Sequence, residues 1–132
     1  MTSTQFSYTR EDNWAKLPPS MKFGIMTGVT ADESGNVYVG QQRQDPPIVV
    51  FDKHGNYLNA WGSGIIDEVH ILTIGNDGYL YAPDRGAHMV HKFDLEGNLV
   101  FSIGERRNPS DTGSWKNWEL KMPVEKAAGP FN

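Results

Sequence analysis

Apolar and polar residues alternate along short stretches of this chain, and turns rich in Asp, Asn and Gly separate the stretches. Such alternation is typical of half-buried strands. It predicts strands near 25–31, 36–41, 47–52 and 57–61, and a second set near 69–75, 79–83, 88–94 and 98–103. The turns read DESG, DKHG, GNDG and DLEG. Asp or Asn early in such a turn hydrogen-bonds its own backbone, and Gly adopts the positive φ that closes a hairpin, so we expect an all-β chain.

The two sets of strands are copies of one unit. VTADESGNVYV aligns with LTIGNDGYLYA, and IVVFDKHGNYLNAWG aligns with MVHKFDLEGNLVFSIG. The turn glycines Gly35 and Gly78 are 43 residues apart, and Gly55 and Gly97 are 42 apart. A period of about 42 residues, with four strands and a terminal glycine in each unit, is the signature of a β-propeller blade.

The repeat divides the chain into four parts. Residues 1–20 form an N-terminal arm, in which Phe6–Thr9 is a candidate edge strand to be exchanged with a neighbour. Residues 21–66 make the first blade and 67–104 the second. Residues 105–132 do not complete a third copy, and we expect a loop that leads toward a next blade.

Composition narrows the class of protein. With 132 residues, 38% of them hydrophobic and 21% charged, the chain resembles a soluble globular domain. It has no cysteine, which excludes disulfides and thiolate metal sites. The net charge of −4, without a cluster of Lys and Arg, disfavours nucleic acid as a partner. No apolar run of membrane-spanning length and no secretory leader is seen, so we expect a cytoplasmic protein, with secretion as the alternative.

The repeats resemble NHL-type blades. The stretches VYVGQQRQDPPIVVFDKHGNYLNAWG and EVHILTIGNDGYLYAPDRGAHMVHKFDLEGNLVFSIG, within residues 21–104, are similar to bacterial NHL-repeat proteins related to peptidyl-α-hydroxyglycine α-amidating lyase, a six-bladed propeller. The resemblance implies metal-assisted cleavage of the C–N bond of an α-hydroxyglycine, which gives an amide and glyoxylate. Activity of this chain by itself is expected to be weak.

The resemblance also implies roles for two residues. In that family three histidines at the starts of inner strands, two blades apart, hold a zinc ion, and His70 matches that position, whereas Thr27 stands at the equivalent place one blade earlier. Arg43 matches an arginine near the substrate carboxylate, whose two oxygens fit a guanidinium fork. A tyrosine from a later blade has no counterpart here, so the general base is unassigned. Ile71 replaces the glycine that commonly follows the histidine.

Two blades cannot close a ring, because a blade is stable only when neighbours cover both of its faces. Trp61 and Phe101 are expected to fill space between blades. We expect a homotrimer, in which three copies complete six blades with threefold symmetry and Phe6–Thr9 adds a strand to a neighbour. Such a ring would bring three copies of His70 to one axis. Zinc is then favoured over calcium or magnesium, because imidazole is a borderline-soft donor.

Simpler interpretations stand beside these. His70 could be an ordinary strand-start residue that hydrogen-bonds a carbonyl group, and Arg43 an ordinary solvated loop residue. Asp84 is expected to be a turn residue, or otherwise an acceptor for an imidazole N–H. His88 and His91, three apart on a strand, face opposite sides and cannot chelate one ion together.

Three further residues receive no metal role or only a packing role. His54 is a turn tip. Trp115 and Trp118 lie in the C-terminal loop, where covering an apolar face is favoured over lining a substrate cleft.

Two other functions remain open from the residues alone. One is a non-catalytic propeller fragment that presents a binding or assembly surface. The other is a lactonase-type hydrolase, a class that typically holds calcium with carboxylates and Asn; the absence of a cluster of Asp, Glu and Asn at the predicted strand starts disfavours it.

Overall fold

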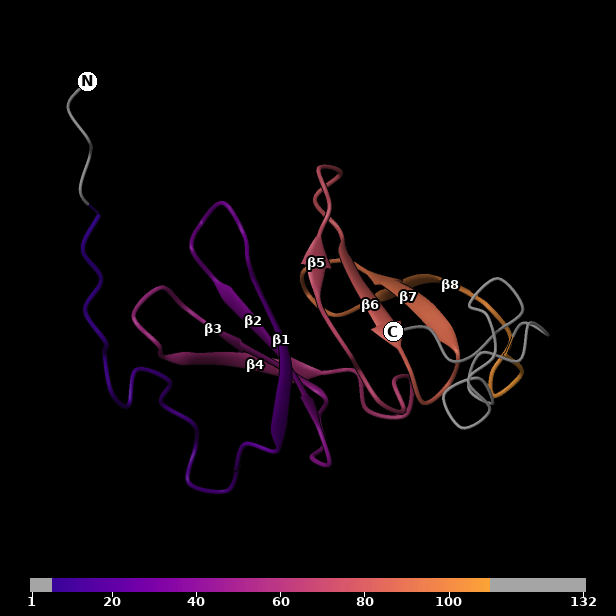
Figure 1. Ribbon diagram of the computed structural model, residues 1–132, viewed down its shortest axis with the longest axis horizontal. Helices are drawn as coiled ribbons and strands as arrows, with labels where there is room; N and C mark the ends of the chain where they lie inside the picture. Colours follow the sequence, from indigo (N-terminus) through magenta and orange to yellow (C-terminus); the bar gives the residue numbers. More distant parts are fainter. Residues whose placement is uncertain (1–5, 110–132) are drawn as a thin grey trace, which may run out of the picture.

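The computed structural model describes residues 6–109, which form two four-stranded antiparallel sheets side by side (Figure 1). No helix occurs among these residues. Each sheet is a meander whose strands pair in sequence order. Sheet 1 contains β1 (Ile25–Ala31), β2 (Val37–Gln42), β3 (Ile48–Phe51) and β4 (Tyr57–Trp61), and sheet 2 contains β5 (Thr73–Ile74), β6 (Leu80–Asp84), β7 (Met89–Phe93) and β8 (Leu99–Ile103).

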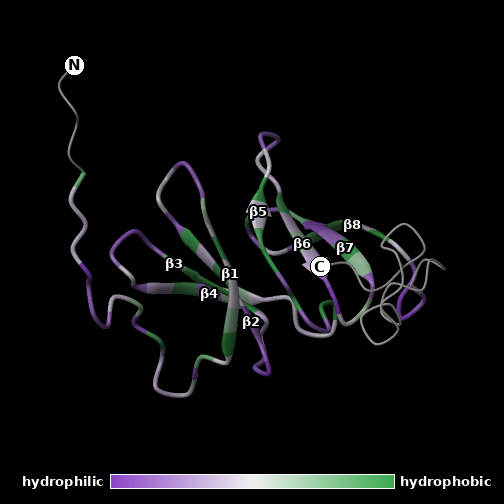
Figure 2. Cartoon of the chain, viewed as in Figure 1, coloured by the Kyte–Doolittle hydropathy of each residue, from purple (hydrophilic) through white to green (hydrophobic). Residues whose placement is uncertain are grey.

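This arrangement confirms the all-β fold and is that of two adjacent propeller blades. The register repeats as the sequence does: both β3–β4 and β7–β8 carry an irregularity at the same place, next to Phe51 and Phe93. Apolar residues concentrate on the strands and polar residues at the hairpin tips (Figure 2). No helix of residues 6–109 is long and apolar enough to cross a membrane.

The hairpin turns form as the Asp, Asn and Gly pattern predicts. Asp32 accepts hydrogen bonds from the backbone N–H and the side-chain amide of Asn36, at 2.9 and 2.8 Å. The same pairing recurs at Asp52 and Asn56, and at Asp94 and Asn98. In the remaining turn Asp77 accepts instead from the hydroxyl of Tyr81 at 2.7 Å. The turn glycines have positive φ, for example 85° at Gly35 and 78° at Gly78.

The innermost strand of sheet 2 is much shorter than predicted. The sequence pattern indicates a strand over 69–75, but β5 spans only Thr73–Ile74. Val69 makes an isolated bridge to Asp84, and residues 70–72 belong to no strand. The prediction was wrong here: the backbone N–H of His70 donates to the carbonyl oxygen of Pro83, but pairing with β6 begins only at Thr73, opposite Tyr81.

The main core lies between the two sheets. The ring centroids of Trp61 and Phe93 are 4.9 Å apart, and the indole lies directly over the backbone of Gly97. The prediction that Trp61 fills space between blades is confirmed. Phe101, in contrast, is half-exposed on the far face of sheet 2, where no further sheet of residues 6–109 covers it. The buried members of this core are Tyr38, Ile48, Val50, Trp61, Ile66, Val69, Leu72, Leu80, Ala82 and Phe93.

The N-terminal arm covers part of the outer face of sheet 1. Residues 6–9 adopt no strand in the chain, so the candidate edge strand is absent from this structure, and its exchange with a neighbour stays a prediction. The arm instead contributes a small second core over Phe51 and makes one bridge, between Lys16 and Asn56. Its packing residues are Trp14, Ala15, Leu17, Met21 and Phe23. At the other end, Trp115 and Trp118 lie outside the described residues.

Candidate functional site

His70 lies where the chain passes from sheet 1 to sheet 2. Its backbone N–H donates to the carbonyl oxygen of Pro83 at 3.0 Å, and its side chain is half-buried. The Nδ1 atom of its imidazole is buried and has no hydrogen-bonding partner among residues 6–109. His70 therefore lies in the segment just before β5 and is held by its backbone, while Nδ1 of its ring is not used by the described part of the fold.

The backbone before His70 is fixed by two side chains of sheet 1. The carbonyl oxygen of Val69 accepts from the hydroxyl of Thr27 at 3.0 Å and from the side-chain amide of Gln42 at 2.8 Å. Gly28 lies so close to Leu72 that a Cβ on it would be 2.7 Å from the Leu72 amide nitrogen. Thr27, at the repeat position equivalent to His70, thus positions the second sheet instead of repeating the histidine.

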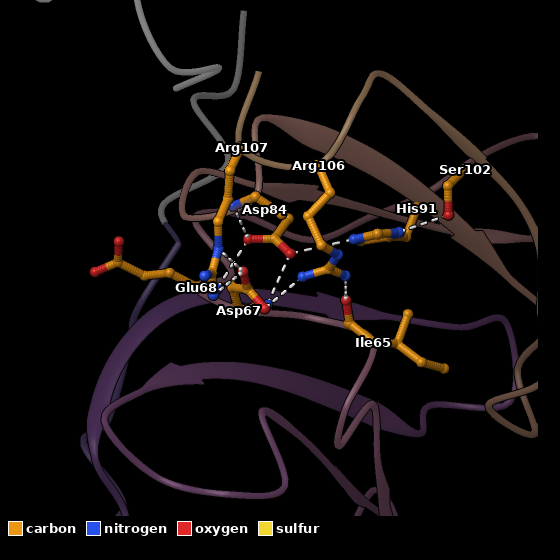
Figure 3. A network of polar contacts seen from close by, with 9 residues as sticks. Ile65, Asp67, Glu68, Asp84, His91, Ser102, Arg106 and Arg107 are labelled. Carbon is orange, nitrogen blue, oxygen red and sulfur yellow. Dashed lines mark hydrogen bonds and ion pairs between the residues drawn. The ribbon is translucent and has the colours of Figure 1, made fainter. Parts of the chain in front are cut away.

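The buried carboxylate of Asp84 in sheet 2 also holds the segment that precedes His70 (Figure 3). Asp84, at the end of β6, accepts backbone N–H bonds from Asp67 at 2.8 Å, Glu68 at 2.9 Å and Ala87 at 3.1 Å. Its Oδ2 also lies 3.1 Å from Nε2 of His91. Burial by itself would raise the pKa of Asp84, but the hydrogen bond from His91 and the three backbone donors outweigh it and lower that pKa to about 2.

His91 completes this network in the interior of sheet 2. Its Nδ1 lies 2.7 Å from the hydroxyl oxygen of Ser102 on β8. A neutral imidazole with its proton on Nε2 donates to Asp84 and accepts from Ser102, which satisfies both ring nitrogens. Asp84 is a turn residue as expected, because it accepts the N–H of Ala87 in the turn after β6, and the imidazole that it also meets is that of His91.

Two arginines after β8 hydrogen-bond to the segment that precedes His70. Arg106 donates to the carboxylate of Asp67 and to the carbonyl oxygen of Ile65. Arg107 donates to the same carboxylate at 3.3 and 3.4 Å (Figure 3). The segment that leads to His70 is therefore fixed by β6, β7 and the turn after β8, and a residue mounted on it is held in one place.

Arg43 lies in the loop between β2 and β3. The residue adopts a positive φ of 61°, and its exposed guanidinium makes no ion pair with any residue of 6–109. It borders a polar cleft of about 500 Å³, which is also lined by Asp45, Ile66 and Asp67. The structure thus brings the loop of Arg43 beside the segment that precedes His70, although His70 does not itself line this cleft.

Residues 6–109 of a single chain offer one imidazole here and no complete metal site. No group of three or more His, Asp or Glu side chains within residues 6–109 is arranged to hold a metal ion. The buried, unpartnered Nδ1 of His70 shows a nitrogen donor that the described fold does not satisfy. That donor suits a borderline-soft ion such as zinc, but it is one ligand of the three or four that zinc takes.

The other histidines have distinct environments. His54 is an exposed turn tip, as expected. His88, with φ of 59°, precedes β7, and its Nδ1 is buried without a partner among the described residues. Sequence reasoning missed the structural role of His91. The repeat carried a usable signal, because His91 aligns with Val49, which is fully buried in sheet 1.

Comparison with known proteins finds a partial similarity to a protein named as a lyase. No protein-family model matches the sequence. A curated protein of Caenorhabditis elegans, named "Probable peptidyl-alpha-hydroxyglycine alpha-amidating lyase pgal-1", is 32% identical over 65 residues, which are 48% of this chain and 19% of that protein. The chain thus spans about a fifth of the length of this relative. The similarity is partial, and it concerns a lyase by name.

Proposed function

We propose that this chain is a two-blade unit of an NHL-type, six-bladed propeller with amidating-lyase chemistry. Supporting observations are the partial identity to the nematode lyase and the two adjacent blade-like sheets. The observation that carries the proposal is the imidazole of His70, whose buried Nδ1 is unpartnered among residues 6–109 and whose backbone is anchored on both sides.

Three copies of the chain would complete the site. In a closed ring of three copies, one His70 from each would face the common axis and supply three nitrogen ligands, which leaves a fourth position open. Zinc held there supplies a positive charge that polarises an oxygen of the substrate. One chain provides one of these ligands, so catalysis belongs to the assembly.

Arg43 has the chemistry to hold the substrate. An N-acyl-α-hydroxyglycine carries a carboxylate, and a guanidinium without another ion pair binds a carboxylate through two parallel hydrogen bonds. As the C–N bond breaks, the hydroxyl oxygen loses its proton and becomes the aldehyde oxygen of glyoxylate. The nitrogen gains a proton and becomes the amide. The residue that transfers the proton is unassigned.

The test combines metal content with product. Native mass spectrometry of the purified protein, supplemented with zinc, should give one zinc ion per three chains, and glyoxylate should be released from an N-acyl-α-hydroxyglycine. His70→Ala should lose both the zinc and the product, whereas the matched variant His54→Ala, at an exposed turn tip, should keep both. Zinc that remains bound after His70→Ala would contradict the site.

A non-catalytic scaffold is the second candidate. It is favoured by the lack of a complete ligand set within residues 6–109 of one chain. In that case the protein assembles without metal, and glyoxylate release is absent in the presence of zinc. The same measurements therefore separate the two functions.

A further inference from the structure

The outer face of sheet 1 carries apolar residues that the repeat elsewhere buries. Val29 on β1 is 67% exposed, whereas Leu72, at the equivalent position before β5, is 5% exposed within the core between the sheets. Met26 is likewise exposed, and its equivalent Val69 is fully buried. The same positions are thus buried when a preceding sheet is present and open when it is not.

Residues on the outer face of sheet 2 are likewise more exposed than their equivalents in sheet 1. Ile103 at the end of β8 is 59% exposed, whereas Trp61, its equivalent at the end of β4, is 8% exposed against sheet 2. Val90 is half-buried and its equivalent Ile48 is fully buried. Phe101 lies exposed beside them. This face corresponds to the face of sheet 1 that forms the core between the sheets.

A groove lies on the outer face of sheet 1, and we call this face the seat for a neighbouring sheet. It has a volume of about 430 Å³ and is lined by Met26, Thr27, Gly28, Val29 and Val39. In sheet 2 the equivalents of Met26, Val29 and Val39 belong to the buried core that meets sheet 1. The groove is therefore shaped for the apolar side chains of a preceding sheet.

The N-terminal arm already occupies the rest of that seat. Trp14 packs on Phe51 with ring centroids 5.9 Å apart, as Trp61 packs on Phe93 at 4.9 Å. Trp14 also lies against Gly55, the turn glycine equivalent to Gly97, with its backbone carbonyl group nearest and its indole next. The outer end of the seat is thus filled by an indole that comes from the arm.

This placement compensates for a difference between the two sheets. The far face of sheet 2 ends in Ile103, whose side chain is smaller than the indole of Trp61. A second copy that placed this face on sheet 1 would therefore lack the tryptophan that closes the internal junction. Trp14 of the receiving copy supplies it, so the arm and a neighbouring sheet occupy adjacent parts of one seat and do not exclude each other.

We propose that the outer face of sheet 2, formed by Val90, Phe101 and Ile103, docks head to tail into the Met26–Val29 groove of a second copy, with Trp14 of that copy closing the junction. This junction would continue the core between the sheets, which is the same interface within one chain. This inference deepens the assembly on which the proposed function rests, and it requires no metal.

The experiment uses one charged substitution on each face. Sedimentation velocity at micromolar concentration in EDTA should show an oligomer for the natural chain and monomers for Val29→Glu and for Ile103→Glu. Both side chains are exposed in the single chain, so the fold should tolerate glutamate, and circular dichroism checks this. A mixture of the two variants should form a one-to-one heterodimer, because Val29→Glu keeps the donor face and Ile103→Glu keeps the receiving face.

Several outcomes would overturn the proposal. These are a monomeric natural chain, association of either folded variant by itself, or a mixture that stays monomeric. The pair Met26→Glu and Phe101→Glu repeats the test if one of the first variants fails to fold. Oligomers that form in EDTA but bind no zinc when it is supplied would leave this inference standing and contradict the proposed metal site, so the two failures are distinguishable.

The role of Trp14 is tested by its removal. Trp14→Ala should weaken association at least about tenfold, as is typical of a buried interface tryptophan. Arg10→Ala, which changes an exposed residue of the same arm outside Phe6–Thr9, should leave association unchanged. Tighter association of Trp14→Ala would show that the arm blocks the seat, and it would overturn the proposed role.

Discussion

Asp84 and His91 form a fully buried hydrogen bond inside sheet 2, with Oδ2 of the carboxylate 3.1 Å from Nε2 of the imidazole. The pair joins the end of β6 to the middle of β7, and the same carboxylate holds the backbone of residues 67 and 68. One buried carboxylate thus links the interior of a sheet to the segment that carries His70.

The pKa of Asp84 makes stability dependent on acid pH. Its folded-state pKa of about 2 lies below that of an unfolded aspartate, so the contribution is complete above the unfolded value near pH 4 and is lost as pH falls toward 2. We expect the free energy of unfolding to fall by on the order of 2 kcal/mol over this range from Asp84. Chemical denaturation at several pH values should show this fall to be smaller in Asp84→Asn. The other carboxylates with a lowered pKa are present in both proteins. An equal fall in both would therefore contradict the contribution of Asp84.

Removal of His91 should destabilise the chain more than removal of its outer partner. His91→Ala deprives the buried Asp84 carboxylate of a donor and leaves a cavity, at a cost of about 3 kcal/mol. Ser102→Ala removes one hydrogen bond to the imidazole, at a cost of about 1 kcal/mol. Urea unfolding of both variants measures the difference. Equal costs would show that the link between Asp84 and His91 contributes little.

Alanine substitutions at two turn glycines, Gly97 and Gly78, test the packing between the sheets. Gly97 and Gly78 both have positive φ, so alanine strains the backbone at either position. At Gly97 the added Cβ would also lie 2.5 Å from Cγ of Trp61, whereas at Gly78 nothing lies within 4 Å. We expect Gly97→Ala to cost about 1–3 kcal/mol more than Gly78→Ala.

The excess cost at Gly97 should depend on the indole. In a Trp61→Ala background the difference between Gly97→Ala and Gly78→Ala should shrink toward zero, because the clashing ring is gone. Thermal unfolding of the single and double variants checks this. A difference that persists without the indole would assign the cost to the turn itself.

Under the proposed function, Arg43 should act on the substrate carboxylate. Arg43→Ala should raise KM for an N-acyl-α-hydroxyglycine at least about tenfold, and Arg43→Lys should restore part of the loss, because it keeps the charge but not the fork. Arg10→Ala, in the exposed part of the arm, is the matched control. A substrate analogue with a carboxamide in place of the carboxylate should be insensitive to Arg43→Ala, and equal sensitivity would contradict the role.

Local patterns in the sequence were sufficient to predict the two sheets and the order of their strands. Asp32 and Asn36 form their turn from residues four positions apart, and the alternation of side chains along a strand is equally local. Repetition of these local signals was enough to predict two blade-like sheets and the contact of Trp61 between them. Candidate site residues such as His70 and Arg43 followed from a resemblance, and their chemistry stays a proposal.

The contacts between residues far apart in the sequence could be seen only in the folded chain. The short β5, the pairing of Asp84 with His91 and the seat of Trp14 on Phe51 each depend on groups that are far apart in the sequence. A buried carboxylate takes its donors from wherever the fold places backbone N–H groups, and an indole packs against whichever apolar face lies open. These contacts depend on which groups the fold brings close together, and the periodicity along the chain does not specify that.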